Sequence, residues 1–279
     1  MSITTGKSFG LGAARAFLME LNASGSPKGV STTPYIGTEV VGIQDLTLTI
    51  PDAQKKTHLG NNQPLQVDFL PPTEAISASI KVSEMDQALY AIVTGTKKAS
   101  YADATVIGLG TNMQGFEPQV AMMVMQQALD ETGTRNWITA IFPKCVIYPH
   151  QGNMDANPSV HSYNIAPAFV SRHLWGIAYT AATEGYTRSQ VSMWQTRYPL
   201  CVCSWLPGVQ SVSYDLKLPT TPVAYPAAAA AKILMFKNEV LLTSPGDYAV
   251  DVGLDGITLV AACLIADRFT CFYERPEPA

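Results

Sequence analysis

The strongest constraint on the fold is an alternation of apolar and polar residues that recurs along the chain. It is clearest in residues 74–82, where Ile76, Ala78, Ile80 and Val82 occupy every second position. Successive side chains of a β-strand point to opposite faces, so this segment has one apolar face and one polar face. The alternation therefore predicts half-buried strands.

The same signal marks four other segments and predicts a mainly β protein. Residues 14–21 and 40–50 alternate in the same way, and residues 118–129 and 137–149 flank a turn-forming stretch at 130–136. The methionine-rich segment 118–129 is also compatible with a helix, but the turn and the strand pattern after it favour a hairpin. We expect a β-sandwich or barrel.

One segment changes to a helical period. After Ser83, residues Met85, Leu89 and Ile92 recur at the spacing of one helix face, and Gly95 closes the run. Ser83 and Asp86 have the spacing of a capping box. The pattern predicts a helix of about eleven residues that packs onto the sheet through Met85, Leu89 and Ile92.

A break in composition divides the chain. Three prolines and a run of five alanines lie between residues 218 and 231. The break predicts a domain over residues 1–217, a Pro/Ala linker over 218–231 and a small C-terminal β-sandwich module over 232–279. The linker leaves two alternatives open, because the module could project on a tether or pack back onto the main domain.

The charge pattern shows no basic surface for binding nucleic acid. Charged residues make up 14% of the chain against 47% apolar residues, and the formal net charge is −4. About a quarter of residues are charged in ordinary soluble domains. A surface this poor in charge suggests coverage by other protein, the alternative being an uncharged polar surface. The longest apolar run, residues 256–266, is too short to span a bilayer, and residues 1–17 lack the apolar segment of a signal peptide.

Motifs that could support catalysis are incomplete. The sequence TGKS at 5–8 lacks the glycine that a phosphate-binding loop places five residues before the Gly-Lys pair. His150, His161 and His173 have no carboxylate or cysteine that completes a ligand set in the sequence. We therefore expect no enzyme activity, no metal and no cofactor, and we expect the five scattered cysteines to be reduced thiols.

The order of the predicted elements resembles that of the tail tube proteins of long-tailed bacteriophages. In that family a strand enters a short helix, and a hairpin with a Phe-Pro turn precedes paired strands. Residues 76–95 and Phe142-Pro143 occupy those places here, and the resemblance covers roughly residues 10–200.

This resemblance implies a structural virion protein. It implies that six copies form a ring, that rings stack into a tube, and that genome DNA passes through the lumen without specific binding. The implied partners are further copies of the chain and the tape-measure and tail-terminator proteins. The implied location is the virion tail, after assembly in the host cytoplasm, with no membrane contact.

The C-terminal residues are similar to small β-sandwich units appended to phage tail and fibre proteins. The similarity rests on Asn238, Asp247-Tyr248, the strand-like residues 256–260 and Ala266-Asp267. It implies a decoration module, and a chain ending near Leu218 should then still assemble. Glu239 departs from the common Asn-Gly turn, so we expect a loop longer than two residues there.

Residues 51–75 are too long and too polar for an ordinary hairpin connection. The resemblance implies that this loop reaches a neighbouring subunit and becomes ordered between stacked rings. Its predicted interface residues are Lys55, Lys56, His58, Leu65, Val67, Phe69 and Leu70.

Two other classes of function remain as alternatives. A capsid decoration or glycan-binding adhesion protein of a virion would use the aromatic residues Tyr248, Phe269, Phe272 and Tyr273 to stack on sugars. The third class is an enzyme with a β-rich fold.

Overall fold

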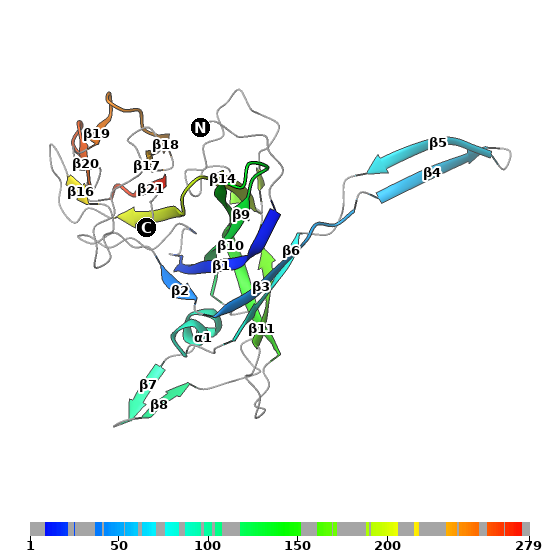
Figure 1. Ribbon diagram of the computed structural model, residues 1–279, viewed down its shortest axis with the longest axis horizontal. Helices are drawn as coiled ribbons and strands as arrows, with labels where there is room; N and C mark the ends of the chain where they lie inside the picture. Colours follow the sequence, from blue (N-terminus) through cyan, green and yellow to red (C-terminus); the bar gives the residue numbers. More distant parts are fainter. Residues whose placement is uncertain are drawn as a thin grey trace.

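Antiparallel sheets dominate the computed structural model of the 279-residue chain (Figure 1). This confirms the prediction of a mainly β protein with one short helix. The structure describes residues 9–21, 25, 37–40, 42–52, 54–60, 63–70, 76–83, 87–95, 98–101, 104–107, 118–151, 161–168, 170–171, 188–189, 191–205, 215–217, 233–238, 240–250, 256–264 and 266–274.

The largest sheet has eight strands in the order β2-β1-β9-β10-β11-β6-β3, with β14 also paired to β10. Its strands are β1 (Phe9–Glu20), β2 (Thr38–Val40), β3 (Ile43–Thr49), β6 (Ser77–Val82), β9 (Val120–Leu129), β10 (Arg135–Gln151), β11 (His161–Pro167) and β14 (Ser192–Thr196). The methionine-rich segment is strand β9, and its hairpin with β10 confirms the predicted turn.

Strand β10 organises this sheet because its two halves have different neighbours. Residues 137–141 pair with β14, whereas residues 145–151 pair with β11. The register with β9 shifts between Phe142 and Cys145. The strand predicted over residues 137–149 is confirmed, and the Phe-Pro turn that the resemblance implied is wrong, because Pro143 is buried inside a continuous strand. Proline lacks an N–H donor, and a bulge is one of the few places where a strand tolerates it.

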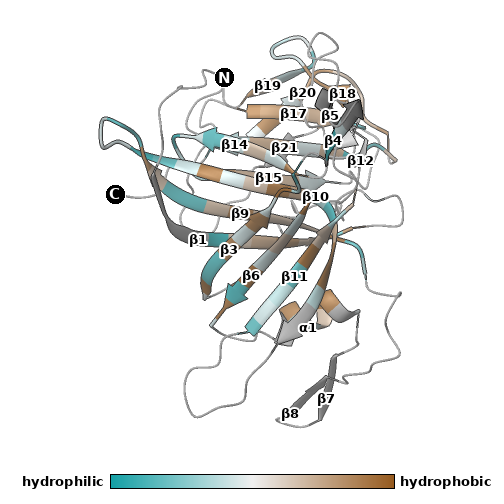
Figure 2. Ribbon diagram, turned by 90° about the vertical axis from the view of Figure 1, so that its right-hand side faces the viewer, coloured by the Kyte–Doolittle hydropathy of each residue, from teal (hydrophilic) through white to brown (hydrophobic). Residues whose placement is uncertain are grey.

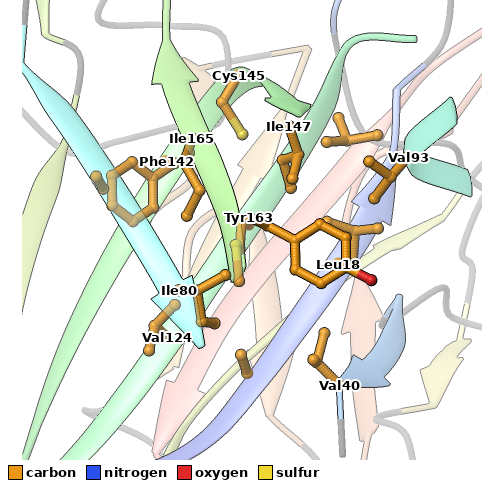
Figure 3. Packing of buried hydrophobic residues seen from close by; sticks show 14 of the residues in the cluster. Leu18, Val40, Ile80, Val93, Val124, Phe142, Cys145, Ile147, Tyr163 and Ile165 are labelled. Atoms are coloured by element: carbon orange, nitrogen blue, oxygen red, sulfur yellow. The ribbon is translucent and has the colours of Figure 1, made fainter. Parts of the chain in front are cut away.

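The eight-stranded sheet curls until β1 and β3 contact each other without strand pairing. Its concave side holds one core, called the inner core here. Figure 3 shows Leu18, Val93 and Tyr163 directed into it from three different elements. The inner core consists of Ala16, Leu18, Val40, Ala78, Ile80, Val82, Leu89, Val93, Val120, Met122, Val124, Ala140, Phe142, Cys145, Ile147, Tyr163 and Ile165.

Helix α1 (Gln87–Thr94) lies at one end of the curled sheet (Figure 2). Leu89 and Val93 belong to the inner core, and Ile92 packs against it. Met85 lies outside the described residues. Gly95 follows the helix with φ of +68°, the left-handed conformation that commonly ends helices. The Ser83 hydroxyl donates a 3.1 Å hydrogen bond to the Gly42 carbonyl, which ties the strand before the helix to the strand β3 region.

The convex side of the same sheet is also buried. Along β1, Met19 belongs to a second cluster, called the outer core here, and Phe17 and Leu21 pack against it. Leu18 of the same strand faces the inner core. The expectation of a half-buried strand is therefore wrong for β1, because both of its faces are covered. The outer core consists of Met19, Ala121, Met123, Met125, Trp137, Ile141, Leu200, Val202, Phe236 and Phe272.

C-terminal strands cover the convex side. One sheet has the order β15-β21-β17-β18 and another the order β16-β20-β19. Their strands are β15 (Leu200–Trp205), β16 (Asp215–Lys217), β17 (Ile233–Lys237), β18 (Val240–Leu241), β19 (Tyr248–Val250), β20 (Gly256–Leu259) and β21 (Phe269–Glu274). A third cluster, called the C-terminal core here, lies between these two sheets and includes Met235, Ile257 and Phe269.

The C-terminal module packs on the main sheet. Phe236 and Phe272 belong to the outer core, and the ring of Phe272 stacks on Trp194 of β14 with centroids 5.4 Å apart. Of the two alternatives for the module, the structure shows the packed one. Strands β15 and β16 precede the proposed linker, yet they pair with β21 and β20. The division at residues 217 and 232 stays a prediction, and most of the linker lies outside the described residues.

The turn between β17 and β18 is tight, which corrects the expected longer loop. Lys237 pairs with Val240, so two residues connect the strands, and Asn238 has φ of +48°. The Asn238 amide donates to the Asp267 carboxylate at 2.8 Å, and Lys237 Nζ lies 2.9 Å from the same carboxylate. These bonds to Asp267 hold asparagine in a conformation that it tolerates better than most residues.

Smaller two-stranded sheets extend the molecule: β4 (Gln54–Gly60) with β5 (Gln63–Leu70), β7 (Lys98–Tyr101) with β8 (Ala104–Ile107), and β12 (Val170–Ser171) with β13 (Arg188–Ser189). Figure 1 shows the β4–β5 and β7–β8 hairpins projecting from the main sheet in different directions.

We expect Leu89→Ala to lower the free energy of unfolding by about 2–5 kcal/mol, because it leaves a cavity in the inner core. Leu89 is 5% exposed. Leu264→Ala is the matched control, since Leu264 is 53% exposed and its truncation should change stability by less than about 0.5 kcal/mol. Denaturant titration measures both, and equal stabilities of the two variants would contradict the packing of α1.

A chain truncated after Leu218 should lose its native state. It lacks β17 to β21, so β15 loses its partner and the outer core opens to water. We therefore expect aggregation or a non-cooperative thermal transition by size-exclusion chromatography and calorimetry. The full-length chain is the control and should show one cooperative transition. A soluble truncated monomer with a cooperative transition would show that the main sheet is stable alone.

Candidate functional site

The predicted interface loop is a hairpin. In this hairpin Gln54 pairs with Leu70 at one end and Gly60 pairs with Gln63 at the other. The register shifts once, between His58 and Leu59. The expectation of an irregular loop in residues 51–75 is therefore wrong. Lysine, glutamine and aspartate are poor strand signals, and the alternation of Leu65, Val67 and Phe69, which is typical of a strand, was assigned to an interface loop instead.

The hairpin lies apart from the body of the protein. The substantial contacts of β4 and β5 are with each other, and Figure 1 shows them extending away from the main sheet. Lys55, Lys56 and Thr57 are exposed, and Asp68, which pairs with Lys56 in register, is half-buried. The side chains of the other predicted interface residues, His58, Leu65, Val67, Phe69 and Leu70, lie outside the described part of the structure.

The chain enters the hairpin through an exposed apolar residue. Ile50 directly follows β3 and is 66% exposed, and Pro51 is half-buried beside it. Sequence analysis missed Ile50 because it continues the alternation of β3 by position and looks like a core residue. The end of pairing after Thr49 leaves it uncovered.

A second group of exposed apolar side chains lies in the C-terminal sheets. Val240 and Leu241 form β18, which pairs with β17 on one side and ends its sheet. Val260 and Leu264, in the loop after β20, are also exposed. These residues were not predicted as a site, and their sequence signals were the apolar residues 240–242 after a turn and the apolar run at 256–266.

Asp130 stabilises the β9–β10 turn. Its carboxylate accepts hydrogen bonds from the Thr132 hydroxyl at 2.6 Å and from the backbone N–H groups of Thr132 and Thr134 at 2.9 and 2.8 Å. The Thr132 hydroxyl and the Thr134 N–H are the main causes that lower the pKa of Asp130. A carboxylate held in this way is a weak base, and its hydrogen bonds hold the turn in place.

Aromatic stacking on a glycan would need exposed rings, and the four rings proposed for it are buried. Tyr248, Phe269, Phe272 and Tyr273 are at most 3% exposed. Tyr248, Phe269 and Tyr273 belong to the C-terminal core and Phe272 to the outer core. The adhesion alternative therefore loses the residues on which it was based.

The five cysteines are free thiols, four of them buried and Cys201 half-buried. His161 lies in β11 and is half-buried, while the side chain of His150 and all of His173 lie outside the described residues. Across the described ranges, no group of three or more histidine, cysteine, aspartate or glutamate residues has the geometry of a metal site. Within the same ranges, no helix is both long and apolar enough to cross a membrane.

No model of a known protein family matches the chain, and no curated protein sequence matches it significantly.

Trypsin should cut the free protein after Lys55 or Lys56 well before it cuts after Lys81. A hairpin held by its own contacts opens locally at a low free-energy cost. Lys81 is an internal control because it is exposed but lies in β6, which is paired with β3 and β11. Mass spectrometry of a digestion time course measures the order of cleavage. Earlier cleavage at Lys81 would show that the hairpin is as protected as the main sheet.

Proposed function

We propose that this protein is a structural subunit of a phage tail tube, in which rings of identical chains stack to form the conduit for genome DNA. The observation that carries the proposal is the β4–β5 hairpin, which extends from a well-packed body and has its main contacts within itself. Strand β6, which leads into the short helix α1, is one of the two features on which the resemblance to tail tube proteins rests, and it supports the same function; the Phe-Pro turn, the other feature, does not.

An isolated two-stranded hairpin is at best marginally stable in water. The β4–β5 hairpin is long for one of this kind, with strands of seven and eight residues. Leu65, Val67 and Phe69 alternate with polar residues in its sequence, a pattern that predicts one apolar face. Such a hairpin gains stability by packing on a partner, and in a homomeric ring a neighbouring copy provides that surface.

Open sheet edges give a second reason for self-assembly. In the described part of the structure, β2, β3 and β14 each pair on one side only. Exposed edges favour pairing with another chain, and proteins cover them or join them. A ring with closed rotational symmetry would join such edges between subunits without leaving a free end.

The low charge of the chain suits a conduit for DNA. Each lysine or arginine that paired with a phosphate in the lumen would add affinity that is independent of sequence and would oppose movement. The exposed Lys55 and Lys56 lie on the projecting hairpin. We expect them to face acidic groups of a neighbouring subunit.

Electron microscopy of the purified protein tests the proposal. The full chain should form long tubes of uniform bore, alone or on an initiating tail complex. Replacement of residues 54–70 by a short glycine-serine turn should abolish tubes and leave a folded monomer with an unchanged main thermal transition, because the hairpin contributes little to the body.

The matched control replaces residues 98–107, the β7–β8 hairpin, which also projects from the main sheet. Tubes from the control variant but not from the β4–β5 variant would support a specific role of the latter. Persistence of monomers of the full chain at high concentration, even with an initiator, would contradict the proposal. Discrete globular particles that bind capsids would favour the capsid decoration alternative.

A further inference from the structure

The C-terminal core contains most of the thiols of the chain. Cys203, Cys263 and Cys271 are buried in it, and Cys201 packs against it. The fifth cysteine, Cys145, belongs to the inner core on the other side of the main sheet. Four thiols thus lie in or against one core, although they come from two distant parts of the sequence, residues 201–203 and 263–271.

Two of these thiols are directly opposite each other. Cys203 of β15 and Cys271 of β21 are register partners in an antiparallel pair. Opposite residues in such a pair have Cα atoms about 4.5–5.5 Å apart, within the usual range for a disulfide of about 4.4–6.8 Å. Both side chains are fully buried in the C-terminal core, so both lie on the same face of the sheet.

The Cys203 thiol also reaches the backbone of the opposite residue. Cys203 Sγ lies 3.9 Å from the carbonyl oxygen of Cys271. The register gives the other thiols different opposite residues, since Cys201 pairs with Tyr273 and Met235 of β17 pairs with Cys271. Among the described strand pairs, the pair of Cys203 and Cys271 places one cysteine directly across from another.

We propose that Cys203 and Cys271 are an oxidation site, at which a disulfide joins β15 to β21 when the protein meets a small-molecule disulfide as oxidant. The bond would link β15, which precedes the other strands of its four-stranded sheet in the chain, to β21, the last strand described. It would thereby stabilise the pairing of the C-terminal strands that cover the outer core.

The reaction balances by two successive thiol–disulfide exchanges. One protein thiol loses its proton, and its thiolate attacks the reagent, breaking the reagent S–S bond and releasing one small thiol. The second protein thiolate attacks the protein sulfur of the mixed disulfide and expels the second small thiol. The two protein thiols lose two electrons and two protons, and the reagent disulfide gains both.

Oxidation of this pair requires local opening. Burial is the main cause that raises the pKa of Cys203, and the neighbouring Cys271 raises it further. The thiolate is the reactive form, so the closed structure protects the pair from rapid reaction. Strand β15 is at the edge of its sheet, where separation from β21 disrupts one strand pairing only.

Peptide mapping after incubation with hydroxyethyl disulfide tests the site. Trypsin releases Cys201 and Cys203 on the peptide 198–217 and Cys271 on the peptide that begins at Phe269. We expect a reducible link between these two peptides in monomeric protein. The link should persist in Cys201→Ser and Cys145→Ser and disappear in Cys203→Ser and Cys271→Ser. The oxidised protein should melt about 10 °C higher than the reduced protein, because the bond closes a long loop.

Two outcomes would overturn the inference. One is a native protein that keeps all five thiols free under conditions in which the same reagent oxidises the urea-unfolded chain. The other is a link that survives in Cys203→Ser or is lost in Cys201→Ser, which would assign the bond to another pair. If a serine variant fails to fold, fragmentation of the linked peptides of the unsubstituted protein by tandem mass spectrometry assigns the bond to Cys203 or to Cys201, and assignment to Cys201 would also overturn the inference. Cys145 is the control for reagent selectivity. Burial raises the pKa of its thiol to about 12, and the members of the inner core include no second cysteine.

Discussion

The structure depends on the burial of both faces of strands β1, β9 and β10. Alternate residues of these strands supply the inner core and the outer core, as Met122 and Met123 do in β9. Full burial of a large apolar side chain contributes about 1.5–3 kcal/mol. The main-sheet residues of the outer core together contribute on the order of 10 kcal/mol, which is comparable to the entire net stability of a typical domain. The C-terminal sheets that cover them are therefore part of the stable unit.

This arrangement changes how the C-terminal region can serve a tube. A module on a free tether could be lost without effect on the wall, but sheets that complete a core cannot. The stacked rings of Trp194 and Phe272 join the two regions directly. In the proposed assembly, the C-terminal sheets belong to the wall itself, and exposed residues such as Val240 and Leu264 lie on a surface that the wall presents.

The β4–β5 hairpin has the opposite character. It takes no part in the three described cores, and its strands are held by pairing with each other. A segment of this kind opens easily and adapts to a partner surface, whereas the doubly covered sheet stays rigid. The proposed function uses this difference: a rigid body sets the geometry of a ring, and an extended arm connects one copy to the next.

Local patterns in the sequence predicted the secondary structure correctly where the whole signal lies within one short continuous segment. The alternation of Ile76, Ala78, Ile80 and Val82, the β9–β10 turn and the end of α1 at Gly95 were all readable, because each depends on neighbouring residues. The sequence also indicated the helix face through Leu89 and Ile92, both of which contact the inner core. The local pattern also predicted the strand over residues 137–149 correctly, whereas the Phe142-Pro143 turn, which only the resemblance implied, was wrong.

Tertiary structure alone decided which faces are covered and which strands meet. Met19 and Leu18 look alike in a strand pattern, and only the sheets packed on each side assign them to different cores. The pairing of β15 with β21, and with it the approach of Cys203 to Cys271, joins residues far apart in the sequence. In the β4–β5 hairpin, β5 has an alternation that is typical of a strand, but β4 is mainly polar, and only the pairing of the two shows that they form a hairpin. Pairing and burial are properties of the whole chain, so no local pattern encodes them.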